Sequence, residues 1–470
     1  MIQIQIFKFL ILLFAVATLF FNSCKKEVYN KVSTNADSST VITNATPGSL
    51  ETSLTATEKA KTTKLTITGN IDARDFIVMH LDMPKLTAID LSEVNIVLYT
   101  GKLIIDGSGL NAEIDPVHFS FNANTIPYTA FFDNVKLISI ILPNSLKAIE
   151  ESSFEGCIGL KEIQIPPSDT VIGSCAFLGC TSLTSISIPS SVTDLNQNAF
   201  ENCTSLTSIT IPSSVSYMGY SIFEGCTSLK SVTLSPSLKY LEPGLFSGCT
   251  SLSSITLPTS IKNIQRGLFY NCKNLTSITI PTTVSYIDYN AFNGCSSLSN
   301  INFPKGLISI NDSAFAHCIG LHSIVIPNTD TIIGSSAFAY CSNLESISIP
   351  PSVKHIYSQT FAFCVSLTSI SITSSVTDIG FEAFVGDSNL TSITIPLSVT
   401  RIDYGAFSYC KGLQSIHIKT VNPININLGS YENVFDNVLT SSCILYVPKG
   451  SKVAYQSAEG WRVFKNIIEE

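Results

Sequence analysis

The chain has 470 residues, of which 45% are hydrophobic and only 13% are charged, and its formal net charge is −8. A chain of this length can bury a large core, but its surface must consist mainly of uncharged polar residues such as Ser, Thr and Asn. The acidic balance argues against a nucleic acid as the partner, because such binding needs a cationic surface.

The N-terminal segment 1–23 has the layout of a secretion signal. Lys8 precedes an apolar run over 9–21, which is short for a membrane-spanning helix. The run ends at Ser23 and Cys24, and a small residue before a single early cysteine resembles the lipid-attachment motif of bacterial lipoproteins. This resemblance implies that Cys24 is lipidated and becomes the first residue of the mature chain. An ordinary signal peptide or an uncleaved anchor is the alternative.

The segment 24–62 is rich in Ser, Thr, Asn and Ala and has little apolar content. This composition predicts a disordered tether with a root-mean-square reach of roughly 30–35 Å. We expect an N-terminal cap at 63–125, because 64–69 predicts a strand, 73–81 a helix, and "LTAIDLSEVNI" at 86–96 has the spacing of an irregular leucine-rich repeat. Residues 99–124 predict a loop-rich insertion, and the sequence indicates no function for them.

The segment 126–420 is an array of 23-residue units. Within one unit, residues 183–188 end in alternating β-branched residues and predict a short strand, which Pro189 ends. The residues around "NAFENC" predict a short helical turn or an irregular arc. One phenylalanine recurs every 23 residues with no insertion: Phe131, Phe154, Phe177, Phe200, Phe223, Phe246, Phe269, Phe292, Phe315, Phe338, Phe361, Phe384 and Phe407. A fixed period of this size is typical of a solenoid.

A single unit cannot fold alone, because burying about seven apolar side chains does not offset the entropy lost in ordering its backbone. Stacking removes this deficit, since each coil covers both faces of its neighbours. We therefore predict an α/β leucine-rich-repeat solenoid with a parallel β-sheet on one side, short helical turns and irregular arcs on the other, and a cap at each end.

The segment 421–470 breaks the period and is interpreted as the C-terminal cap. It predicts a strand at 444–447, a turn at 448–450 and a short helix from Ser451. We expect Trp461 to pack with Phe464 and Ile467, and a binding platform at Trp461 is the alternative.

The repeating unit C-x-x-L-x-x-I-x-I-P-x-x-V-x-x-I-x-x-x-A-F-x-x resembles the BspA-like leucine-rich repeats of bacterial and some protozoal surface proteins, over 131–419. Departures are local, such as Asp387 at a cysteine position and Asp169 at an apolar position. The resemblance implies a curved right-handed solenoid and a cell-surface role in adhesion to host proteins, other cells or glycans.

Most of the 14 cysteines occupy one position of the unit. Equivalent residues of stacked coils lie about 4.8 Å apart with parallel side chains, whereas a disulfide needs converging Cβ atoms about 3.8 Å apart. We therefore predict a ladder of buried, reduced thiols, with disulfides as the alternative. No metal site is expected, because the only nearby histidines are His317 and His322 and one coil cannot supply four ligands. The ladder comprises Cys157, Cys180, Cys203, Cys226, Cys249, Cys272, Cys295, Cys318, Cys341, Cys364 and Cys410.

No catalytic motif is apparent. The histidines lie in no metalloprotease or triad-like pattern, and no glycine-rich phosphate loop or paired-carboxylate pattern stands out. We therefore expect neither an enzyme nor a bound cofactor. An enzyme would need convergent polar residues that break the repeat, and only 99–124 is irregular enough to leave that alternative open.

Two sets of residues are candidate binding surfaces. The outward strand positions form a hydroxyl-lined face that could bind a glycan or an extended protein, or could simply keep the sheet soluble. The second set is aromatic, is expected on turns away from the sheet, and either contacts a partner or seals the arc between coils. The first set includes Ser185, Ser187, Ser208, Thr210, Thr233, Thr256 and Thr279; the second is Tyr217, Tyr240 and Tyr286 at one position and Tyr220, Tyr289 and Tyr404 at another.

The sequence thus predicts an exported, lipid-anchored binding or adhesion module of the bacterial outer membrane or cell surface. Its partner would be a host matrix or cell-surface protein. A glycan-binding accessory protein and a purely structural surface spacer are the alternatives. The sequence indicates no oligomeric state.

Overall fold

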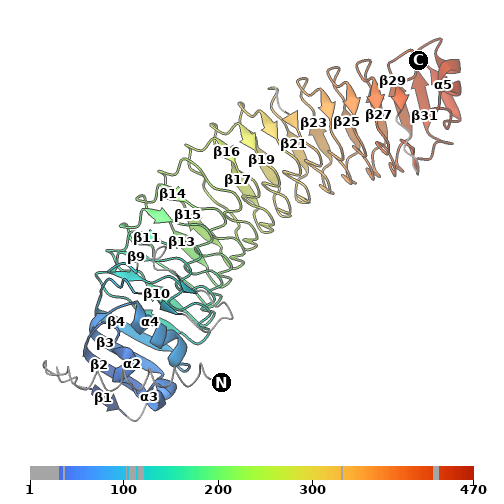
Figure 1. Ribbon diagram of the computed structural model, residues 1–470. Helices are drawn as coiled ribbons and strands as arrows, with labels where there is room; N and C mark the ends of the chain where they lie inside the picture. The colour runs from blue at the N-terminus through green and yellow to red at the C-terminus, as the bar shows by residue number, and fades with distance from the viewer. Residues whose placement is uncertain are drawn as a thin grey trace.

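The computed structural model describes residues 31–34, 38–101, 103–104, 113–114, 121–329, 332–426 and 433–470. These residues form a curved solenoid whose N-terminal and C-terminal regions lie at opposite ends (Figure 1). One continuous hydrophobic core runs along it from Ile42 to Ile467. The predicted solenoid is therefore confirmed.

The first row of strands lies where the sequence predicts a strand in each repeat. Partners in neighbouring coils are parallel and 23 residues apart, as in Ser208 opposite Ser231. Residues 185–187 and 254–256 hold the same place in their coils but are not paired as strands. The row contains β4 (Ala88–Ile96), β8 (Ser139–Ile141), β10 (Glu162–Gln164), β13 (Ser208–Thr210), β15 (Ser231–Thr233), β17 (Ser277–Thr279), β19 (Asn300–Asn302), β21 (Ser323–Val325), β23 (Ser346–Ser348), β25 (Ser369–Ser371), β27 (Ser392–Ile395), β29 (Ser415–Ile418), β31 (Ile444–Val447) and β32 (Asn466–Glu469).

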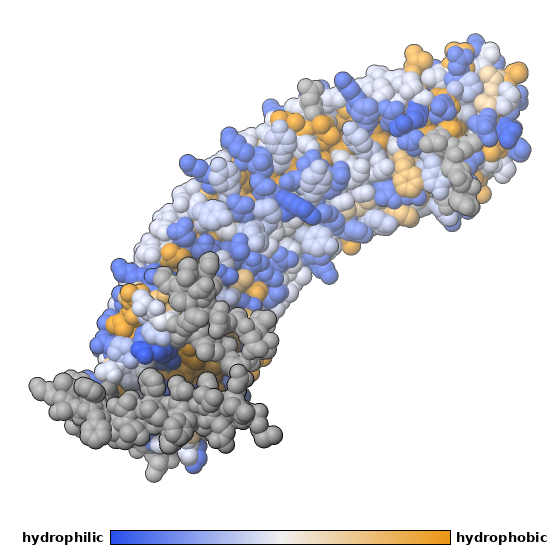
Figure 2. All heavy atoms as spheres, viewed as in Figure 1, coloured by the Kyte–Doolittle hydropathy of each residue, from blue (hydrophilic) through white to orange (hydrophobic). Residues whose placement is uncertain are grey.

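A second row of two-residue strands runs beside the first, after the repeat proline (Figure 1). The second residue of nearly every pair is a buried aliphatic one, while the first is at least partly exposed in most pairs and buried at Thr125 and Ser309. Figure 2 shows one face of the solenoid, which is mainly hydrophilic or intermediate in hydropathy with scattered hydrophobic residues. The second row contains β7 (Thr125–Ile126), β9 (Ala148–Ile149), β11 (Val171–Ile172), β12 (Asp194–Leu195), β14 (Tyr217–Met218), β16 (Asn263–Ile264), β18 (Tyr286–Ile287), β20 (Ser309–Ile310), β22 (Ile332–Ile333), β24 (His355–Ile356), β26 (Asp378–Ile379), β28 (Arg401–Ile402) and β30 (Asn425–Ile426).

The repeat phenylalanines form a stacked spine inside the solenoid. Each is fully buried, and neighbouring ring centroids lie 5.1–6.0 Å apart. Phe435 extends the spine beyond Phe407 at 5.9 Å. Phe76 meets Phe131 at the other end with its ring edge, also at 5.9 Å. The spine therefore ties both caps to the array.

The arc around each phenylalanine is irregular rather than helical. Residues two before and two after the phenylalanine have positive φ, as at Ser152 (53°) and Gly156 (72°) around Phe154. This alternation points three N–H groups at the next coil: Ser152 donates to Ser174 at 2.9 Å, Phe154 to Ala176 at 2.9 Å, and Gly156 to Leu178 at 2.8 Å. The arc thereby satisfies buried backbone groups between coils rather than within a helix.

Many Ser and Thr hydroxyls also hold neighbouring coils together. Ser214 donates to the Val192 carbonyl at 2.7 Å, and Thr207 donates to the Thr184 carbonyl at 3.3 Å. The equivalent Ser or Thr does the same in several other coils. The abundance of these residues therefore has a structural cause in addition to solubility.

The predicted tether is wrong from Ser39 onward. β2 (Ser39–Ala45) pairs with β1 (Lys31–Thr34) and with β3 (Lys64–Ile71), and α2 (Leu50–Ser53) and α3 (Ala56–Lys61) follow it. Ile42, Leu50 and Leu54 are buried. The low apolar content led to the wrong prediction, because an end unit of the solenoid needs few apolar residues. Some of its buried positions are polar, and the Thr40 hydroxyl is buried through a 2.8 Å hydrogen bond to Thr62.

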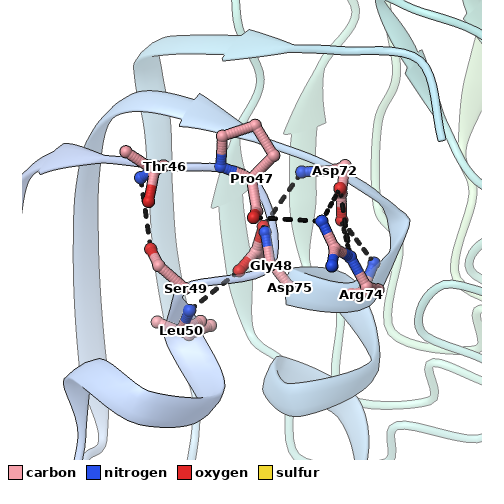
Figure 3. A network of polar contacts seen from close by, with 8 residues as sticks. All are labelled: Thr46, Pro47, Gly48, Ser49, Leu50, Asp72, Arg74 and Asp75. Carbon is pink, nitrogen blue, oxygen red and sulfur yellow. Dashed lines mark hydrogen bonds and ion pairs between the residues drawn. The ribbon is translucent and has the colours of Figure 1, made fainter. Parts of the chain in front are cut away.

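A buried carboxylate fastens this segment to the rest of the cap (Figure 3). Asp75 lies in α4 (Ala73–Ile77), which continues into the π-helical turn η1 (Val78–Asp82). It accepts hydrogen bonds from the backbone N–H groups of Gly48 at 2.8 Å, Leu50 at 2.9 Å and Asp72 at 2.9 Å. A soluble fragment must therefore begin before Ser39. The insertion contributes β5 (Leu103–Ile104) and β6 (Glu113–Ile114), and most of its other residues are outside the described ones.

The C-terminal cap continues the first row. β31 falls where the sequence predicts it, and α5 (Lys452–Ser457) leads to β32. Trp461 is buried, its indole N–H donates to the Ile424 carbonyl at 3.0 Å, and its ring lies 6.4 Å from that of Phe464. Trp461 is thus a core residue of the cap rather than an exposed platform.

Candidate functional site

The hydroxyl face consists of the outward Ser and Thr of the first row. Its members are exposed, and the aliphatic residue between each pair is buried. Among the described residues, none of these hydroxyls has a hydrogen-bond partner in the protein, in contrast to the Ser and Thr that link neighbouring coils. The face extends over many coils but is interrupted where β10 carries Glu162 and Gln164 and β19 carries Asn300 and Asn302, and it lacks a large anchoring side chain through most of its length. Its predicted members are Ser185, Ser187, Ser208, Thr210, Thr233, Thr256 and Thr279.

The tyrosines expected on turns lie instead along the second row of strands. Tyr217 begins β14, Tyr286 begins β18, and Tyr240 holds the same place in the coil between β14 and β16. They point outward because the next residue, such as Met218, fills the core. Their exposed fractions are 48%, 42% and 66%, respectively. The expectation missed this row because a two-residue strand is too short to show an alternating pattern.

Tyr220 and Tyr289 lie three residues beyond Tyr217 and Tyr286 and are exposed to a similar extent. We call Tyr217, Tyr220, Tyr240, Tyr286 and Tyr289 the tyrosine face. Among the described residues these five rings contact no other aromatic ring, and each side chain is 42–66% exposed. Tyr404 differs: it is half-buried and stacks on Phe381 at 5.3 Å.

Charged groups on the second row differ between the two halves of the solenoid. In the C-terminal half, Asp378 accepts a hydrogen bond from His355 at 2.8 Å and lies 3.8 Å from Arg401. Burial opposes the ionised form, but the Thr377 and His355 hydrogen bonds outweigh it and lower the pKa of Asp378. In the tyrosine half, exposed Lys239, Lys262 and Arg266 form no ion pair within the described part of the chain. That half therefore presents exposed tyrosines beside cations that have no ion pair, and Lys354 in the C-terminal half likewise has none among the described residues.

An aromatic ridge, which the sequence reasoning missed, runs along the arc. His317, Tyr340 and Phe363 stand two residues after the spine phenylalanine, and their rings stack at 4.5 and 4.8 Å. All three have φ near 60° at a position that is glycine or asparagine in most other coils. The sequence does show the replacement of glycine or asparagine by a ring-bearing residue at this position in three successive units, which could have predicted the ridge.

The ridge carries backbone strain that its own stacking does not fully offset. A bulky residue in the left-handed region costs about 1–2 kcal/mol, or about 3–6 kcal/mol for three. Two stacked pairs return about 1–3 kcal/mol. Beside the ridge, Ala316, Ala339, Ala362 and Val385 form a small apolar cluster separate from the main core.

The cysteine ladder is buried, and each Sγ donates to the carbonyl of the phenylalanine 26 residues earlier at 3.0–3.2 Å. All described cysteines are free thiols, and Cys175 and Cys443 lie outside the ladder. Burial raises the pKa of Cys157, Cys226 and Cys341 to about 12, so these thiols are poor nucleophiles. No cluster of His, Cys, Asp and Glu in the described part of the chain could hold a metal ion.

Asp387 replaces one thiol of the ladder and is fully buried. Neither carboxylate oxygen has a hydrogen-bond partner, and burial raises its pKa well above the ordinary value. Asp169 is similarly buried, but one oxygen accepts a hydrogen bond from the Val171 N–H at 3.1 Å, and burial raises its pKa to about 6. Asp387 is therefore the less well accommodated of the two acids.

The family model for the BspA-type leucine-rich repeat region matches residues 124–246, 222–341 and 308–437. The chain belongs to the BspA-type leucine-rich repeat family. This confirms the resemblance drawn from the repeating unit. Members of the family are generally bacterial cell-surface proteins that bind other proteins, and the solenoid is generally a binding or structural fold rather than an enzyme.

A solved structure with a similar sequence agrees with this fold. A leucine-rich repeat protein from Bacteroides ovatus is 26% identical, with a TM-score of 0.68, and the match covers 95% of this chain and 100% of that one. A leucine-rich cell surface protein from Faecalibacterium prausnitzii is 24% identical, with a TM-score of 0.42, covering 84% and 94%. No curated protein matches the BspA-type chain. Across the described residues, no helix is both long and apolar enough to span a membrane.

Replacing Asp387 with cysteine should stabilise the protein by about 1–3 kcal/mol at pH 7, since it removes an unsatisfied buried group. The folded-state pKa of Asp387 is raised, so the contribution of this residue to stability is most favourable below its unfolded pKa of about 4 and is lost as pH rises toward the raised pKa. Urea unfolding of both proteins at pH 4.5 and pH 7 should show a difference that grows with pH. Exposed Glu345→Gln is the control, and a pH-independent difference would contradict the assignment.

Proposed function

We propose that this BspA-type protein is a lipid-anchored, non-catalytic adhesion module of the bacterial outer membrane, which binds a host matrix or cell-surface protein through the tyrosine face. The observation that carries this proposal is the set of outward tyrosines that are 42–66% exposed and contact no other aromatic ring among the described residues. Tyr is among the residues that dominate binding energy at protein interfaces, because it buries a large area at low entropic cost. Lys239, Lys262 and Arg266 would supply polar contacts around them.

The hydroxyl face supports a second candidate function, which is binding of a glycan. Its hydroxyls are exposed and free of partners in the protein, so each can donate and accept hydrogen bonds. Hydroxyl contacts alone lack the apolar anchors that usually dominate an interface. We therefore place the protein partner first. A surface spacer, the third possibility, would need neither face.

The anchor is proposed from the sequence, because Cys24 and the preceding segment lie outside the described residues. A lipid on Cys24 would place the solenoid beside the membrane. The intervening segment is shorter than expected, since strand β1 begins at Lys31 and pairs with β2. The N-terminal cap would then stand close to the membrane, with the tyrosine face farther out along the solenoid.

Replacing Tyr217, Tyr240 and Tyr286 with threonine should weaken binding to the protein partner by at least about 30-fold, as expected for loss of a hot spot worth about 2 kcal/mol. Threonine preserves strand preference at these positions. The soluble chain from residue 31 would be applied to arrays of host matrix proteins and glycans. Its matched control replaces Thr210, Thr233 and Thr256 with alanine. Binding that only this control abolishes would instead establish the hydroxyl face.

Protease treatment of intact cells tests the location and the anchor together. The natural chain should be cleaved and should fractionate with the membrane. Cys24→Ala should leave the protein unprocessed or released, because no lipid can be attached. Protection of the natural chain from protease, or membrane fractionation of Cys24→Ala like that of the natural chain, would contradict this arrangement.

A further inference from the structure

We propose that the aromatic ridge His317–Tyr340–Phe363 is a second docking surface, separate from the tyrosine face, for an extended protein segment with apolar side chains at one end and basic ones at the other. The first observation is the strained backbone at three successive coils. Most other coils relieve this strain with glycine or asparagine, so packing of the array does not require rings here. Residues kept in such conformations cluster at functional sites.

The surroundings of the ridge are apolar where other coils are polar. The residue after the spine phenylalanine is alanine in the coils of Phe315, Phe338 and Phe361, whereas it is glutamate in those of Phe154, Phe200 and Phe223. Tyr340 remains 44% exposed despite its stacking. The stacked rings cover each other's faces and leave their edges outward, where an aliphatic or aromatic side chain can pack edge-to-face.

The size of the ridge favours a segment over a folded partner. Its two ring spacings of 4.5 and 4.8 Å give a strip of only about 9 Å between the outer rings. A stable interface between folded proteins needs about 800 Å² on each partner. The ridge is much smaller than that, so we assign it a peptide-like occupant.

Glutamates on the phenylalanine arc, in coils nearer the N-terminus, indicate the charge of the bound segment. Glu155, Glu201 and Glu224 lie one residue after their spine phenylalanines and form no ion pair within the described residues. Burial, together with the neighbouring Glu224 and Glu155, raises the pKa of Glu201. Basic side chains would relieve this repulsion, which is why the segment should be basic where it crosses these coils.

The distance between the glutamate-bearing coils and the aromatic ridge sets the number of residues between the basic and apolar ends of the bound segment. Four spine intervals of 5.1–5.9 Å, about 22 Å in all, separate the coil of Phe223 from that of Phe315. An extended chain covers this distance in about seven residues at roughly 3.3 Å each. At the ridge position, the coils between carry Gly248, Asn271 and Gly294, and exposed Tyr270 lies one residue before Asn271 beside this path.

The test uses synthetic peptides with a lysine triplet and a Leu-Trp-Leu run about seven residues apart, in both orders. Binding to the chain from residue 31 would be followed by fluorescence anisotropy. We expect saturable, salt-sensitive binding of at least one order. It should weaken at least about tenfold in Tyr340→Asn/Phe363→Gly and also in Glu201→Gln/Glu224→Gln.

Two comparisons keep the outcome decisive. Tyr340→Asn/Phe363→Gly should retain or raise the thermal midpoint, because asparagine and glycine suit the left-handed position. A lower midpoint with unchanged peptide binding would show that the ridge is only packing and would overturn the proposal. Peptide binding equal to that of a glutamate-for-lysine peptide would also overturn it. The threonine variants of Tyr217, Tyr240 and Tyr286 should bind the peptide normally, so this surface and the tyrosine face can fail separately.

Discussion

The structure depends on backbone hydrogen bonds that pass from each coil to the next at the phenylalanine arc. Two left-handed residues per coil, such as Ser152 and Gly156, direct N–H groups along the solenoid axis. The bonds form only if the neighbouring coil presents its carbonyls opposite these N–H groups, and a group left unpaired would cost about 1–3 kcal/mol. They persist into the C-terminal cap, where Phe407 donates to Val434 at 2.9 Å and Tyr409 donates to Asp436 at 2.7 Å. Phe435 continues the spine only after the array ends, where the interval is no longer 23 residues.

Packing of the core constrains which residues can occupy the inward positions, whereas the outward positions can vary between coils. Differences in function must therefore come from the outward residues. The hydroxyl face extends over many coils, whereas the tyrosine face and the aromatic ridge occur in particular coils. In the C-terminal part of the second row, His355, Asp378 and Arg401 pair with one another, although Lys354 forms no ion pair among the described residues. The tyrosine half differs from it in carrying outward tyrosines that contact no other aromatic ring in the described part of the chain.

The sequence predicted the solenoid, the buried position of the repeat phenylalanines and β31, because period and alternation report inward positions directly. It missed the order of Ser39–Thr62, since the end unit buries few apolar residues and pins its backbone through Asp75. The second row escaped notice because two-residue strands have no period of their own. Whether a side chain such as Tyr340 stacks or stands open depends on left-handed backbone geometry, which composition does not reveal. The sequence pattern likewise did not distinguish the exposed tyrosines from Tyr404, which stacks on Phe381 in the structure.

The central claim is that a protein partner meets the tyrosine face rather than the hydroxyl face. The most direct measurement places a photo-crosslinking amino acid at Tyr240 or at Thr256 and irradiates the protein while its partner is bound. Both positions are exposed and lie in neighbouring coils, so the two probes differ mainly in the face that they report. We predict a covalent adduct with the partner from position 240 and none from position 256. An adduct from position 256 alone would contradict the account and assign binding to the hydroxyl face.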